Sequence, residues 1–135
     1  MRTENWEKRF HEIIERARNK PFEYGTHDCV LLAGEILKDI EGLDSLITFK
    51  GKYNNKFGAL RLISEYGESM REAFTRFTNF VEFPIAFAAR ADIVLHLFKN
   101  EEFLGICLGS QIAIPSDKGL TFMPLEEAIC CWKEK

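Results

Sequence analysis

The residues with the clearest capacity for chemistry are His27, Asp28 and Cys29, which stand between a glycine turn and an apolar run. Cys29 falls at the first turn of a predicted helix, where unpaired backbone N–H groups and the helix dipole lower the pKa of a thiol. A nucleophilic cysteine also needs a base beside its sulfur, usually a histidine. A second interpretation stays open: Asp28 or Thr26 caps the helix, and Cys29 belongs to its buried apolar stripe.

His96 is one candidate base for Cys29. A two-residue hairpin turn at Lys99 and Asn100 would pair His96 directly with Phe103, on the same face of the sheet. His96 would then be within reach of Cys29 from the neighbouring strand. The alternative is a half-exposed strand histidine with no role in chemistry.

His27 is the other candidate base, because it lies only two positions before Cys29. We expect its ring to point into solvent or into the turn. His11 falls on the polar edge of the first helix and is predicted to lie at the surface. Tyr53, in a polar loop, either reaches the cysteine pocket or covers the core.

These side chains must be positioned by helices in the first part of the chain and strands in the second. Apolar residues at helical spacing predict helices over residues 6–19, 28–41, 56–66 and 68–80, with Val81 still at helical spacing at the end of the last one. Residues 49–55 read as a loop. Runs rich in apolar and β-branched residues predict strands over 92–98, 103–108, 111–114 and 120–123, and 125–132 as a short helix or a final strand.

This order predicts an α+β fold in which N-terminal helices pack on a small C-terminal antiparallel sheet, a meander. The length of 135 residues indicates one domain, residues 1–135. Twelve phenylalanines favour a well-filled core, and a second reading makes Phe74, Phe77, Phe80, Phe83 and Phe87 a partner-binding face.

Composition excludes several classes of function. The net charge is −3 with acids and bases mixed, so no basic stripe for nucleic acid is present. The four cysteines show no metal-ligand spacing, and we expect no cofactor, no metal and no disulfides, with one thiol of the Cys130-Cys131 pair exposed. The polar N-terminus is not a secretory signal, and no apolar run is long enough to span a membrane. We therefore expect synthesis in the cytoplasm with reduced thiols.

The Asp28-Cys29 pair at the start of a helix, followed much later by a small antiparallel sheet, resembles the NlpC/P60 papain-like cysteine peptidases. The stretch 91–94 matches an Asp-Leu-Val-type strand of that family, with Ala91 where glycine is usual. The stretch 103–109 matches the strand that carries the catalytic histidine. The resemblance implies a compact papain-like fold and, for active members, cleavage of peptidoglycan stem peptides.

This chain departs from that pattern at the positions that matter for catalysis. The position of the peptidase histidine falls on Phe103, and the third polar position falls near Ala113 or Ile114. A thiol with phenylalanine in place of its base cannot run the usual acyl transfer. The departures indicate an inactive scaffold, a pseudoenzyme, in which Cys29 is a relic packed beneath the sheet.

The chain also resembles, over nearly its whole length, a DUF6950-like group of small phage and prophage proteins of unknown function encoded among tail genes. The matching pieces are a Trp-bearing first helix, the turn at 24–29, and the stretches 50–53, 92–94, 104–109, 117–120 and 124–125, with Trp132 in the tail. This resemblance implies a virion component with other tail proteins as partners, and peptidoglycan peptides as a second possible ligand.

Two functions follow. The first is a tail-associated protein with an inactive papain-like fold that acts in tail assembly or binding. The second is an active cysteine hydrolase of peptidoglycan peptides, with Cys29 as nucleophile, His96 or His27 as base, and the Cys29 backbone N–H in the oxyanion hole. The state of the Cys29 thiol distinguishes them, since reactivity follows thiolate content.

Overall fold

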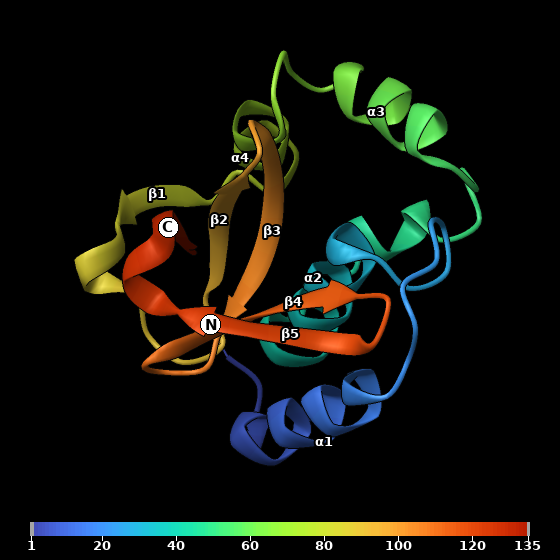
Figure 1. The fold of residues 1–135 in the computed structure, drawn as a ribbon. Helices are drawn as coiled ribbons and strands as arrows, with labels where there is room; N and C mark the ends of the chain where they lie inside the picture. The colour runs from blue at the N-terminus through green and yellow to red at the C-terminus, as the bar shows by residue number, and fades with distance from the viewer. Residues whose placement is uncertain (1, 135) are drawn as a thin grey trace.

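The structure, a computed structural model, describes residues 2–134, in which four α-helices pack against a six-stranded antiparallel sheet. The helices are α1 (Trp6–Arg18), α2 (Cys29–Ile36), α3 (Lys56–Ser64) and α4 (Met70–Thr78). Figure 1 shows α1 and α2 close to the hairpin of β4 (Gln111–Ser116) and β5 (Gly119–Pro124), whereas α3 stands at the periphery. The α+β class predicted from the sequence is confirmed.

The extent of side-chain burial shows which helix is central. One stripe of α1 is buried, whereas every residue of α2 except Glu35 is buried, so α2 is the central helix of the domain. A π-helical turn, Leu37–Glu41, extends α2 to Gly42, which adopts φ 76°. The predicted helix over 28–41 is therefore confirmed. It ends at a glycine in the left-handed conformation, as many helices do.

The strands are β1 (Val81–Pro84), β2 (Ile93–Phe98), β3 (Glu101–Cys107), β4 (Gln111–Ser116), β5 (Gly119–Pro124) and β6 (Ala128–Lys133), in the spatial order β1-β6-β2-β3-β4-β5. The predicted meander holds for β2 to β5. It is wrong for β6, which returns to lie between β1 and β2. Val81 begins strand β1 instead of ending a helix, because α4 stops at Asn79 in the left-handed conformation.

The β2–β3 hairpin has the predicted register. Lys99 and Asn100 form its turn with φ 50° and 63°, and His96 pairs with Phe103. The tail contains both predicted alternatives in sequence, a 3-10 turn at Leu125–Glu127 and then β6. Two further 3-10 turns, Leu46–Phe49 and Ile85–Phe87, were not predicted.

The core occupies both faces of the sheet unequally. The helix-covered face holds the main core, which includes Phe10, Leu32, Ile36, Leu95 and Trp132. The other face holds a small cluster that contains Val94, Cys107, Ile112, Ala128 and Cys131.

Two predictions about side-chain exposure can be compared with this core. Both Cys130 and Cys131 are buried, so the expected exposed thiol is wrong. Phe74 and Phe80 are buried and fill the core, Phe77 and Phe83 are half-buried, and only Phe87 is exposed. The five phenylalanines therefore do not form one continuous surface.

Candidate functional site

The turn before α2 is held by the carboxylate of Asp28. This side chain accepts hydrogen bonds from the backbone N–H of Leu31 at 2.9 Å, from the N–H of Gly25 at 3.0 Å and from the Tyr53 hydroxyl at 2.7 Å. The predicted cap is confirmed, and Tyr53 does reach the cysteine pocket. Gly25 is required here, because a Cβ would lie 1.8 Å from the Tyr53 carbonyl oxygen.

Cys29 is the first residue of α2, and its thiol is buried. Burial raises the pKa of this thiol to about 12, and the nearby Asp28 carboxylate acts in the same direction. A backbone hydrogen bond from Leu104 of β3 lowers the pKa only in part. Burial therefore raises the pKa of the thiol more than the N-terminus of α2 lowers it, and Cys29 is a neutral thiol at pH 7.

His96 lies on β2 and is buried, with only 3% of its surface exposed, so the predicted half-exposed position is wrong. Its Nδ1 has no hydrogen-bond partner within residues 2–134, and burial lowers its pKa against a weaker opposing effect of Glu127. Strand β2 lies between β3 and β6, where His96 pairs with Phe103 on one side and with Ala128 on the other, so it is in the interior of the sheet.

His27 is also buried, at 7% exposure, so of the two positions expected for its ring, solvent or the turn, the solvent position is wrong. A tight turn holds it through backbone hydrogen bonds in both directions with Glu23. Burial and the charge of Lys20 lower its pKa. His11 is exposed, as predicted.

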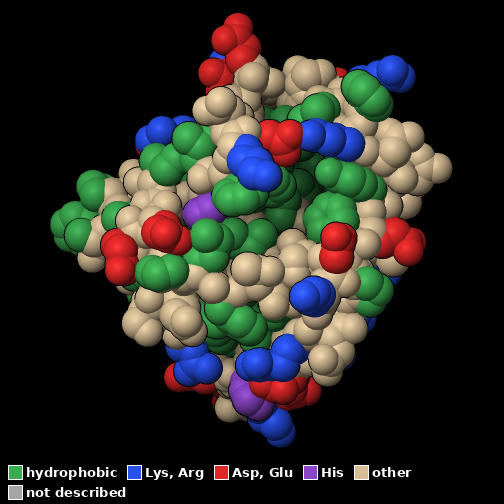
Figure 2. Space-filling model, viewed as in Figure 1, with side chains coloured by type: hydrophobic (Ala, Val, Ile, Leu, Met, Phe, Trp, Pro, Cys, Tyr) green, Lys and Arg blue, Asp and Glu red, His purple; other side chains and the backbone are tan. Residues whose placement is uncertain are grey.

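A large open cleft leads to Cys29. We call it the α3 cleft; its volume is about 640 Å³, within the range of ligand sites. One wall is the start of α2, the second is α3 with the loop to Met70, and the third is the β2–β3 hairpin. Its lining includes Asp28, Cys29, Tyr53, Lys56, Ala59, Leu60, Ile63, Glu68, Met70, Leu97, Glu101, Glu102 and Phe103. In Figure 2 a hollow lined by hydrophobic side chains opens on the viewed face, with charged side chains at its edge.

The site residues predicted from the sequence divide between this cleft and the protein interior. Cys29 and Phe103 both line this cleft. Of the described residues that line the cleft, none is a histidine. Ala113 is buried on β4.

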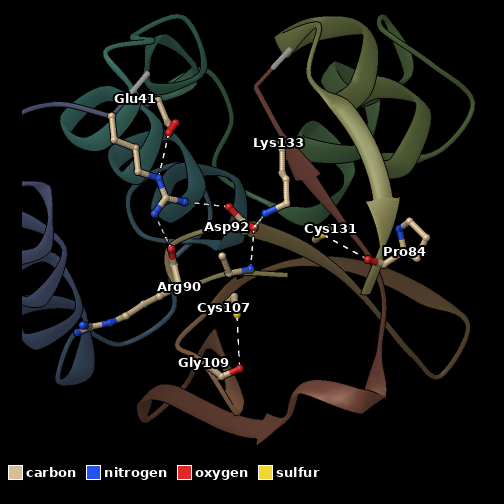
Figure 3. A network of polar contacts seen from close by, with 10 residues as sticks. Glu41, Pro84, Arg90, Asp92, Cys107, Gly109, Cys131 and Lys133 are labelled. Carbon is tan, nitrogen blue, oxygen red and sulfur yellow. Dashed lines mark hydrogen bonds and ion pairs between the residues drawn. The ribbon is translucent and has the colours of Figure 1, made fainter. Parts of the chain in front are cut away.

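Asp92, from the strand that resembles the peptidase pattern, has a structural role instead. Its carboxylate meets the Arg2 guanidinium at 2.8 Å and the Lys133 ammonium at 2.5 Å, and it accepts the N–H of Ala89 at 2.8 Å. Arg2 also contacts Glu41 at 3.2 Å (Figure 3). Asp92 therefore ties both ends of the chain to the sheet, away from the α3 cleft.

The remaining cysteines offer no metal site. Cys107, Cys130 and Cys131 are buried free thiols, and burial raises the pKa of each. Within residues 2–134 no group of three or more histidine, cysteine, aspartate or glutamate side chains is arranged to hold a metal ion. The helices in this part of the chain are all too short or too polar to cross a membrane.

Sequence reasoning missed the wall formed by α3. Lys56 at its start forms an ion pair with Glu101 in the β2–β3 hairpin, and the two lie 45 positions apart. No local pattern signals such a contact. In the structure Phe57 and Leu60 of this helix are exposed, so α3 does not pack closely over these side chains.

The fold and the cleft define an α+β domain with a cysteine at a helix start that packs against a sheet. The sequence matches the family described as a domain of unknown function, DUF6950, over residues 1–134, and the chain belongs to this family. No curated protein and no solved structure matches the chain.

Proposed function

We propose that this protein is a phage or prophage tail-associated binding protein whose papain-like domain lacks peptidase activity. The observation that carries the loss of activity is the buried, neutral thiol of Cys29, with a pKa of about 12, in a cleft that Phe103 shares. A thiol that stays protonated is a poor nucleophile.

Two geometric features support the papain-like part of the proposal. Cys29 opens the central helix and receives a backbone hydrogen bond from β3, the strand that carries the histidine in the NlpC/P60 pattern. Ala91 adopts φ 75°, a conformation that favours glycine, and glycine is the usual residue at this position of that pattern.

The role in a phage tail is supported by the order of sequence motifs that resemble proteins encoded among tail genes. A site without a usable nucleophile fits assembly or binding better than hydrolysis. The hydrolase alternative needs a base beside Cys29, and among the described residues His27 and His96 both lie outside the α3 cleft lining. The geometry therefore favours the binding role.

Mass spectrometry of tails isolated from the producing phage or prophage tests this function. We expect the protein to co-purify with tails or tail intermediates, and Cys29→Ser protein to be incorporated equally well. Absence of the wild-type protein from these particles would contradict the tail role. Loss of infectivity or of tail maturation in Cys29→Ser, with incorporation intact, would instead support the hydrolase.

A further inference from the structure

The opening of the α3 cleft is bordered by apolar side chains that nothing covers within residues 2–134. Leu60 on α3 is 51% exposed and Leu97 on β2 is 47% exposed, and both line the cleft. Ile63, Met70 and Phe103 continue the apolar lining inward. Exposed apolar residues that converge on a hollow mark a binding surface more often than scattered single ones do.

Charge at the same opening is unbalanced. The lining contains one basic residue, Lys56, against the exposed or half-buried acids Glu68, Glu101 and Glu102, and Lys56 already pairs with Glu101. Over residues 2–134, neither Glu68 nor Glu102 forms an ion pair.

A second basic residue, Arg71, lies beside Glu102 and offsets the negative charge of the opening only in part. Arg71 donates its backbone N–H to Glu102, at 3.4 Å, and the charge of Glu102 raises the pKa of the Arg71 guanidinium. The hydrogen bonds of this guanidinium to Glu82, at 2.6 and 2.8 Å, have the larger effect, so its charge is directed mainly to Glu82. The cleft therefore favours a ligand with positive charge and disfavours an acidic one.

The backbone of β3 in the hairpin wall of the cleft suits an extended ligand. Strand β4 pairs with β3 only at Ile106 and Cys107, so the part of β3 that lines the cleft has no strand partner on that side within the described chain. The backbone of Leu104 is an exception, because it already forms a hydrogen bond with the Cys29 thiol. An extended ligand places alternate side chains on opposite sides. One set would then face the apolar lining of the cleft, and the other would face the acidic residues at its opening.

From these three features we propose that the α3 cleft binds an extended segment of a partner protein in which leucine-like residues alternate with lysine or arginine. The inference rests on the proposed binding role and names the chemistry of its partner. The apolar side chains contact Leu60, Ile63, Met70 and Phe103, and the basic ones contact Glu68 and Glu102. Lys56 competes with the basic residues of the ligand, because its ammonium forms an ion pair with Glu101.

Fluorescence anisotropy with a labelled peptide of alternating leucine and lysine tests the proposal. We expect saturable binding that weakens with salt, and no binding of an equally long peptide of alternating leucine and glutamate. The double variant Glu68→Gln with Glu102→Gln should weaken binding roughly tenfold, since it removes two charge pairs with the peptide, each of modest strength at an exposed site. Glu126→Gln, a matched change at an exposed acid outside the cleft, should leave binding unchanged.

Lys56→Ala separates this proposal from general damage to the fold. It removes the competing ammonium and frees Glu101, so we expect binding to tighten about threefold, whereas a disrupted cleft would bind more weakly. Leu60→Ser, at an exposed position that does not support the core, should weaken binding.

Each outcome bears on the proposal. Equal binding of both peptides, no binding of the basic peptide, or weaker binding by Lys56→Ala would overturn it. Cleavage of a bound peptide would leave the ligand chemistry standing and contradict the proposed inactive role. Absence of the protein from tails would contradict the tail role alone.

Discussion

At the scale of single residues, Asp28 illustrates how a motif residue typical of a peptidase can serve structure. Its buried carboxylate joins the turn, the helix and the Tyr53 loop through three hydrogen bonds. We expect Asp28→Ala to lower the free energy of unfolding by about 2–4 kcal/mol, because it removes a cap and leaves buried donors unpaired. Tyr53→Phe removes a single bond and should cost about 1 kcal/mol. Urea unfolding measures both, and equal losses would contradict the central role of Asp28.

Phe103 offers a second test at this scale. If the papain-like comparison is right, Phe103→His places an imidazole in the cleft that Cys29 lines. A fall of about one unit in the pKa of the thiol raises the thiolate fraction, and so the rate of iodoacetamide labelling at pH 7, about tenfold. Phe103→Leu is the matched control, since it opens the cleft without adding a base. Equal labelling of the two variants would speak against the papain-like geometry.

The residue scale also shows where the sequence was informative about the site. The cap at Asp28 and the pairing of His96 with Phe103 depend on local spacing, and both were predictable. The protonation state of the Cys29 thiol was not predictable from the sequence. Its pKa depends on burial in the folded chain and on a contact with Leu104 of β3, which lies 75 positions further along the sequence. The burial of His96 likewise depends on β6, which no local pattern places beside β2.

At the scale of elements, α3 is the part of the fold with the weakest attachment. Only Ala59 of this helix is buried, and Phe57 is 82% exposed. We expect its amides to exchange hydrogen roughly 100-fold faster than those of α2, because local opening of α3 exposes little apolar surface. Mass-spectrometric hydrogen exchange measures this. Equal protection of α3 and α2 would show that α3 is a fixed wall of the cleft.

Most helices and strands were predictable from the spacing of apolar residues, since all four helices and strands β2 to β5 lie where the sequence predicts them. The errors lie where tertiary pairing decides. Val81 fits the helical spacing of α4, but pairing with Lys133 of β6 makes it a strand residue. The return of β6 into the sheet is a long-range contact, which no periodicity encodes.

At the scale of the whole molecule, buried titratable groups set the pH range of stability. Burial lowers the pKa of His27 and His96 below the ordinary value of about 6.5, so the unfolded chain binds more protons as the pH falls below 6.5. Burial raises the pKa of Cys29 and Cys130 to about 12, above the ordinary value of 9.0, so the unfolded chain loses protons first above pH 9. Stability is therefore greatest between about pH 6.5 and 9.

Urea midpoints at pH 5.5, 7.5 and 10 check this prediction. We expect the midpoint to be highest at pH 7.5 and lower at both other values. Cys29→Ala should reduce the alkaline loss, and His96→Gln should reduce the acidic loss, each relative to its own value at pH 7.5. A midpoint that is constant across the three values would contradict the assignment of buried neutral groups.

We propose that the molecule keeps the frame of a cysteine peptidase without its reactive thiolate. The most direct test is the pH dependence of Cys29 alkylation by iodoacetamide in the native protein, read by peptide mass spectrometry, with Cys29→Ser as control. We predict almost no labelling at pH 6 to 8, and rapid labelling only after denaturation, because the thiol is buried and its pKa is about 12. Rapid native labelling already near pH 6, lost in His96→Ala or His27→Ala, would contradict the account and identify a cysteine–histidine hydrolase.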